Sequence, residues 1–180
     1  MNAVPDQLEI VQAFVNTADV GSGSDEFATS AALVAWLAER ALIEQGTAAN
    51  EDELERTRAL REALRALLYA NSGGELDPKA PPVLDATAER AGLRLYFCAD
   101  GEAGLMSCAE GVDGAQGRLL AIVAEAMRAG TWSRLKACRS DDCQWAFFDE
   151  SKNHSRAWCS MAVCGNRAKA RAFRERRAGA

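Results

Sequence analysis

The chain has 180 residues, of which 48% are hydrophobic and 26% are charged, a composition typical of globular proteins. This length can form one sizeable core or a core with a small module, and its longest uncharged apolar stretch, residues 27–38, is too short to cross a bilayer. The first six residues contain no basic leader and no apolar targeting segment. We therefore expect a cytoplasmic protein with reduced thiols and no membrane partner.

The net charge of -5 is unevenly distributed. Residues 131–180 contain eleven Lys/Arg and five Asp/Glu, a balance of +6, which leaves ten basic and twenty-one acidic residues, a balance of -11, in residues 1–130. Such an asymmetry predicts an acidic body followed by a module that binds a polyanion. We place the junction at Gly130–Thr131, which gives two domains, 1–130 and 131–180.

Four segments of the acidic body have the apolar spacing of amphipathic helices. Their apolar positions are 8, 11, 14 and 15; then 33, 36, 37 and 41; then 60, 64, 67 and 68; and finally 119, 122, 123 and 127. The third helix is predicted over residues 51–70, which are rich in Ala, Glu, Arg and Leu, and the fourth over 114–128. Pro82 predicts the first turn of a further short helix between these two.

A β-hairpin is predicted between the last two helices of the body. Residues 93–98 alternate apolar and polar side chains, Asp100–Gly101 then forms a turn, and the chain returns through Leu105. Because an isolated hairpin is marginally stable in water, we expect this one to lie on the helices. With a turn at Gly101–Glu102, Cys98 would face Leu105 rather than Cys108, so we expect no disulfide there.

The remaining four cysteines form two closely spaced pairs, Cys138-x4-Cys143 and Cys159-x4-Cys164, separated by fifteen residues. This spacing predicts one structural Zn²⁺ with four thiolate ligands. Four unrelated core cysteines, or disulfides, are the alternatives. His154, the only histidine, would have to displace a thiolate to bind the metal.

The segments around the cysteines predict a knuckle, a hairpin and a helix. Residues 145–148 read as a strand, 149–153 as a turn, and 166–177 as a helix that contains no Gly or Pro. Cys164 would then lie at the N-terminus of this helix, where the dipole favours a thiolate. The predicted fold class is therefore mainly α: a helical N-terminal domain with a small β-hairpin, plus a C-terminal treble-clef-like zinc finger.

The predicted C-terminal helix is strongly basic. On a helical wheel, Asn166, Ala170 and Phe173 share one face, which we expect to pack against the zinc core. The adjoining cations suit phosphate binding, so we expect a DNA partner. RNA is an open alternative, and the simplest alternative is that these cations only form a solvated helix face. The predicted nucleic-acid contacts are Arg156, Arg167, Lys169, Arg171, Arg174, Arg176 and Arg177. Arg167 could instead pair with Asp149 inside the finger, which would make it structural.

The string Cys159-Ser-Met-Ala-Val-Cys164-Gly-Asn-Arg167, with residues 148–158 before it, resembles the CGNR zinc finger family of bacteria. The body resembles the ABATE domain, a stress-induced transcription regulator, through Phe14-Val-Asn-Thr17, the helix at 33–37 and residues 59–64. In two places the family usually has arginine, whereas this chain has Lys152 and Ala157. The resemblance implies a bacterial, DNA-binding transcription regulator.

Two further expectations concern the body and the partners. Asn16-Thr17 reads either as the polar end of the first helix or, with Trp36, as part of an effector pocket. The sequence contains no phosphate-binding loop, nucleophile elbow or paired catalytic carboxylates, so we expect a regulator and not an enzyme. The alternative function is a zinc-stapled protein–protein interaction module without nucleic-acid binding. A homodimer is compatible with either function.

Overall fold

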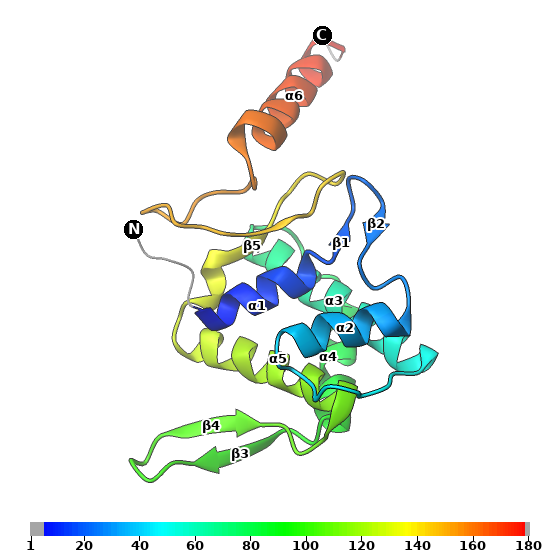
Figure 1. The fold of residues 1–180 in the computed structure, drawn as a ribbon. Helices are drawn as coiled ribbons and strands as arrows, with labels where there is room; N and C mark the ends of the chain where they lie inside the picture. Colours follow the sequence, from blue (N-terminus) through cyan, green and yellow to red (C-terminus); the bar gives the residue numbers. More distant parts are fainter. Residues whose placement is uncertain (1–5, 179–180) are drawn as a thin grey trace.

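The computed structural model of the protein describes residues 6–178 (Figure 1). The expectation that no leader is present concerns residues outside this range. Most of the described residues are helical, in α1 (Asp6–Val15), α2 (Ser30–Glu39), α3 (Glu51–Asn71), α4 (Ala80–Arg90), α5 (Gly111–Arg128) and α6 (Asn166–Ala178). The strands form three two-stranded antiparallel sheets: β1 (Ala18–Asp19) with β2 (Ser24–Asp25), β3 (Arg94–Phe97) with β4 (Ala103–Met106), and β5 (Leu135–Ala137) with β6 (Ala146–Phe148). The mainly α fold class is confirmed.

The helices begin where the sequence provides caps. Thr29 caps α2, and Asn50 with Glu53 forms a reciprocal capping box at the start of α3. Two prolines occupy the first turn of α4, where their missing N–H groups cost nothing. Helix α5 begins at Gly111, three residues earlier than predicted. Its Gly117 allows a close approach, because a Cβ there would lie 2.7 Å from the Cβ of Ala91.

The core of the body lies between α1, α2, α3 and α5. Three aromatic rings at its centre, Phe14, Phe27 and Trp36, have centroids 5.5–5.8 Å apart in tilted and edge-on contacts. None of the described helices is long and apolar enough to span a bilayer.

Two arginines of α3 are buried and bind the chain around the β1–β2 turn. Arg61 forms a bidentate ion pair with Asp25 at 2.7 and 2.8 Å. Arg65 is 3% exposed and donates to the carbonyls of Val15, Ala18 and Gln144. Buried carbonyls need donors, so these guanidinium groups allow irregular segments to pack on a helix. Helical periodicity alone did not reveal this role.

The β3–β4 hairpin differs from the prediction in register and in position. Leu95 pairs with Leu105 and Phe97 with Ala103, so Cys98 lies opposite Glu102, not opposite Leu105. The turn is therefore centred at Asp100, before the Gly101–Glu102 position that we expected. The hairpin also projects from the body and packs on α5 mainly through β4, whereas β3 is exposed along its length (Figure 1). The expectation that the hairpin lies on the helices is thus confirmed for β4, which packs on α5, but not for β3.

The β5–β6 hairpin is built into the body. Trp132, Leu135 and Phe148 belong to the same core cluster as the helices. The side chain of Asn71 donates to the carbonyls of Trp132 and Leu135, and Ser72 donates to Ala137. The hairpin is therefore fixed against α3. The domain boundary at residue 130 stays a prediction.

Candidate metal centre and basic helix

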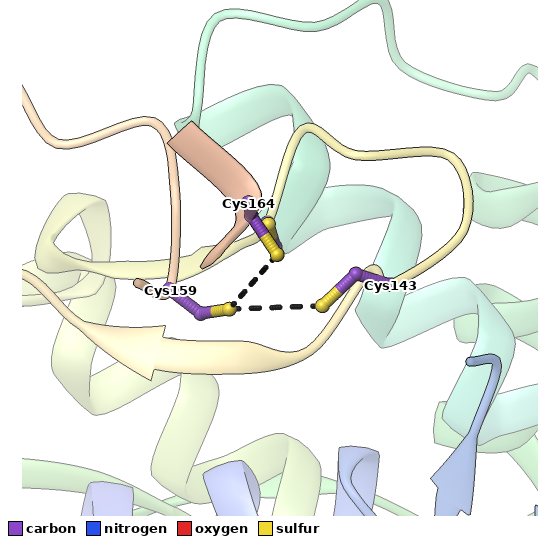
Figure 2. A group of neighbouring side chains, drawn as sticks. Cys143, Cys159 and Cys164 are labelled. Carbon is purple, nitrogen blue, oxygen red and sulfur yellow. Dashed lines mark hydrogen bonds between the residues drawn. The ribbon is translucent and has the colours of Figure 1, made fainter. Parts of the chain in front are cut away.

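The four cysteines of the predicted metal site lie together. Cys138 follows β5, Cys143 lies in the loop before β6, and Cys159 ends a long loop. Cys164 lies in η2 (Met161–Gly165), a single π-helical turn that leads into α6. All four sulfur atoms lie within 4.8 Å of one another. The Sγ–Sγ distances are 3.6 Å between Cys143 and Cys159 and 3.8 Å between Cys159 and Cys164 (Figure 2).

These distances fit a tetrahedral metal. A tetrahedron with metal–sulfur bonds of about 2.3 Å, the zinc–thiolate length, has sulfur–sulfur edges of about 3.8 Å. The cluster contains four soft donors and no carboxylate or histidine among the described residues, so His154 is not part of it. Four thiolates at this spacing are the donor set of a closed structural zinc site.

The surroundings of three of these cysteines shift the pKa values of their thiols. Burial and the neighbouring cysteines raise the pKa of Cys164 to about 11 and shift that of Cys159 further upward. Burial opposes ionisation of Cys138 as well, but backbone N–H groups of Cys159 and Ser140 lower its pKa. A metal ion would supply the charge that keeps four adjacent thiolates deprotonated.

A buried ion pair supports the loop that carries Cys159. Lys136, 4% exposed, donates to Asp149, which is fully buried, at 2.8 Å, and also to the carbonyls of His154 and Arg156. Asp149 accepts further bonds from the N–H groups of Ser151 and Arg156. Burial of Asp149 opposes ionisation, yet these donors hold its pKa well below the usual range. The pairing of Arg167 with Asp149 is therefore wrong, and Lys136 takes that role.

Arg156 lies inside the finger. Its guanidinium carbon lies 5.0 Å from the centre of the Phe147 ring, and Nη2 donates to the carbonyl of Cys159 at 2.9 Å. This half-buried side chain thus fixes one metal-ligand segment on β6. It is less available to phosphates than the sequence suggested.

Helix α6 extends away from the rest of the molecule. It packs mainly on η2 and points outward, beyond the finger (Figure 1). Phe173 is 54% exposed, so the expectation that it packs against the metal core is wrong. The π-helical turn sets a direction for α6 that a continuous α-helix from Cys164 would not have.

The cations of α6 differ in their surroundings. Arg171 lies 3.6 Å from Asp141 and 3.4 Å from Asp142, both in the loop between Cys138 and Cys143. Among residues 6–178, no ion pair involves the other basic side chains of α6, which are exposed: Arg167, Lys169, Arg174, Arg176 and Arg177. Arg177 also lies over the ring of Phe173, at 5.7 Å from its centre.

Asn16 and Trp36 line one open cavity of about 490 Å³. Helix α1 ends at Val15, and the Asn16 amide makes two bonds to the backbone of Ala146, with Nδ2 donating at 2.9 Å and Oδ1 accepting at 2.7 Å. Trp36 is 5% exposed, with the Arg40 guanidinium 3.9 Å above its ring. Trp145 of the finger lines the same cavity, which therefore spans both parts of the chain.

A helical body joined to a four-cysteine knuckle, hairpin and helix defines a treble-clef-like zinc-finger protein. Comparison with family models gives two matches: residues 8–129 match ABATE, described as "Putative stress-induced transcription regulator", and residues 134–177 match the CGNR zinc finger. The chain belongs to the ABATE family and has a CGNR zinc finger at its C-terminal end. A comparison with curated proteins finds no significant match.

Proposed function

We propose that this protein is a cytoplasmic, zinc-dependent transcription regulator that binds duplex DNA through α6. The main supporting observation is the projection of α6 with six basic residues and one acidic residue among its thirteen. Such a helix is about 20 Å long and can follow the phosphates that border a groove. The acidic body, with its balance of -11, does not provide such a surface.

Zinc bound to the four cysteines would join the two knuckles and so fix η2, from which α6 begins. The side chains proposed to contact phosphates are the exposed cations without an ion pair: Arg167, Lys169, Arg174, Arg176 and Arg177. Arg171 contributes only after leaving Asp141 and Asp142. Arg156 acts by holding the loop at Cys159.

The test is DNA binding by the full chain over a salt series, because the β5–β6 hairpin shares its core with the body. Replacing both Arg174 and Arg176 with alanine should weaken binding to any duplex and reduce the log–log salt slope by about one for each phosphate that is no longer neutralised. The matched control is Lys79→Ala, at an exposed lysine outside the finger, which should change neither the affinity nor the salt slope. If the protein binds duplex RNA more tightly than duplex DNA, with the same salt dependence, its nucleic-acid partner is RNA.

We further propose that the cavity at Asn16 and Trp36 binds a small effector. Its volume of about 490 Å³ lies within the range of ligand sites, and its walls come from α1, α2 and the loop after Cys143. A ligand there would contact Trp145 and neighbour the Asn16–Ala146 bonds that join the body to the finger. A ligand screen read by tryptophan fluorescence, with Trp145→Phe as the control, would test this role.

One observation favours the alternative, a protein–protein interaction module. Met161, Val163 and Phe173 are 48–54% exposed around the start and middle of α6. If wild-type protein shows no salt-dependent affinity for DNA or RNA, the regulator proposal fails and this apolar and basic surface becomes a protein-binding site.

A further inference from the structure

The β3–β4 hairpin is the most apolar exposed surface on the body. Leu95 is 57% exposed and Phe97 is 73% exposed, and Tyr96, Leu105 and Met106 are each 38–40% exposed. Leu95, Phe97 and Leu105 share one face of the hairpin, and Tyr96 and Met106 lie on the other. Soluble proteins rarely leave several neighbouring large apolar side chains in water unless they bind a partner. We call these five residues the arm patch. It lies at the opposite end of the molecule from α6 (Figure 1).

The outer edge of β3 is free to pair with another strand. The sheet has two strands, and Cys98 donates its N–H to the carbonyl of Glu102 on the β4 side. Because these groups alternate along a strand, Leu95 and Phe97 direct their N–H and C=O groups away from β4. The edge lacks the proline, central lysine or bulge that usually prevents such pairing.

The charges of the arm are self-complementary. Arg94 lies at the base of β3, and Asp100 and Glu102 lie in the turn at its tip. When two copies meet antiparallel about a twofold axis at Phe97, the last residue of β3, Arg94 of each copy is level with the turn of the other, where Asp100 lies. This register also pairs Phe97 with its own symmetry mate, through the outward backbone groups. An acidic tip is unfavourable for a nucleic acid or an anionic membrane.

We propose that this chain forms a twofold homodimer through the arm, in which the Phe97 ends of the two β3 strands meet antiparallel. An isologous contact of this kind is the commonest closed assembly, and it pairs the outward backbone groups of Phe97 in both copies at once. Tyr96 already covers Gly104 within its own hairpin, where a Cβ would lie 2.8 Å from the ring. The face with Leu95, Phe97 and Leu105 therefore contributes the apolar band that becomes continuous in the dimer. Both α6 helices remain free, so this inference is independent of DNA binding.

The first test is the mass of the zinc-loaded full chain by sedimentation velocity over a concentration series. We expect a reversible dimer that Phe97→Lys converts to monomer. Phe173→Lys, at another exposed phenylalanine, on α6, should leave the dimer intact. Both sites are exposed, so both variants should keep the wild-type circular dichroism spectrum. A wild-type monomer at every concentration, or a Phe97→Lys dimer, would overturn the proposal.

Charge exchange tests the register. Arg94→Asp alone and Asp100→Arg alone should each weaken dimerisation, whereas the double variant should restore it. A short bismaleimide at limiting concentration should crosslink two copies through Cys98 on the arm. Cys98→Ser should abolish that product, and Cys108→Ser, at the other exposed cysteine, should not. Failure of the double variant to restore the dimer, or crosslinking through Cys108, would refute this pairing.

Discussion

At the scale of single residues, buried charges hold the irregular parts of this protein. Lys136 and Asp149 form an ion pair that is almost completely excluded from water and that also binds four backbone groups of the loop before Cys159. Removing one partner of such a pair leaves an uncompensated buried charge, which is far more costly than the loss of a surface pair.

Lys136→Met should therefore destabilise the zinc-loaded protein by about 3–5 kcal/mol, because Asp149 stays buried without its cation. Chemical denaturation of both proteins measures this difference. Lys169→Met, at an exposed lysine of α6, should change stability by less than about 0.5 kcal/mol. Equal effects of the two substitutions would show that the Lys136–Asp149 pair is not formed.

The Arg61–Asp25 pair predicts a specific pH dependence. Its hydrogen bond from Arg61 lowers the pKa of Asp25 below the ordinary 3.8, although partial burial opposes this. The pair's stabilisation is thus present above about pH 4 and is lost as the pH falls through the lowered pKa. Asp25→Asn should be less stable than wild type at pH 7, and the difference should shrink below about pH 4. Melting temperatures of both proteins across that range test the sign.

At the scale of elements, α6 is held in place by a short contact with η2 and by Arg171. On the proposed function, the aspartates at 141 and 142 would compete with DNA phosphates for that guanidinium, since an exposed ion pair at 3.4–3.6 Å is weak and screened by salt. The loop between the first two cysteines thus restrains the helix that the proposed function uses.

Replacing Asp141 and Asp142 with asparagine should release Arg171 and remove two negative charges near the DNA. We expect tighter DNA binding at low salt and a salt slope steeper by about one. Anisotropy titrations of the variant and of wild type compare both quantities. The control is Asp77→Asn, an exposed aspartate outside the finger. Weaker binding by the finger variant would mean that these aspartates position α6 for DNA.

At the scale of the whole molecule, the β5–β6 hairpin next to the metal site shares the core of the helical body, whereas Cys138 and Cys164 belong to a separate small cluster. Leu135, Ala137 and Phe148 pack with the helices, and Arg65 of α3 donates to Gln144, the residue after Cys143. Loss of metal should therefore affect more than the last fifty residues.

Chelation should lower the melting temperature of the full chain, because structural zinc supplies roughly 10–16 kcal/mol of apparent binding energy in small fingers. Cys159→Ser should lose the metal and behave like the chelated protein. Cys108→Ser should keep one zinc per chain by elemental analysis. If purified protein contains no metal, or if Cys159→Ser retains it, the four-cysteine site is not a zinc site.

Slow zinc release in dilute peroxide is also expected, since closed thiolate sites resist mild oxidation.

The sequence by itself determined the helices, the pairing of the cysteines and the charge asymmetry. Helices α1, α2, α3 and α5 follow from local apolar periodicity and α4 from the proline in its first turn, and the two cysteine pairs follow from the ligand spacing of zinc knuckles. These signals are local, because each depends on residues within a few turns of one another.

Only the tertiary structure decided which long-range groups meet. Lys136 rather than Arg167 binds Asp149, Asn16 binds Ala146 across 130 residues, and Phe173 lies in solvent rather than on the metal site. The register of β3 and β4 depended on where the turn is centred, because a small shift of the turn changes every cross-strand pair. Such contacts depend on how elements pack in space, and the periodicity of a single segment carries no information about its partner.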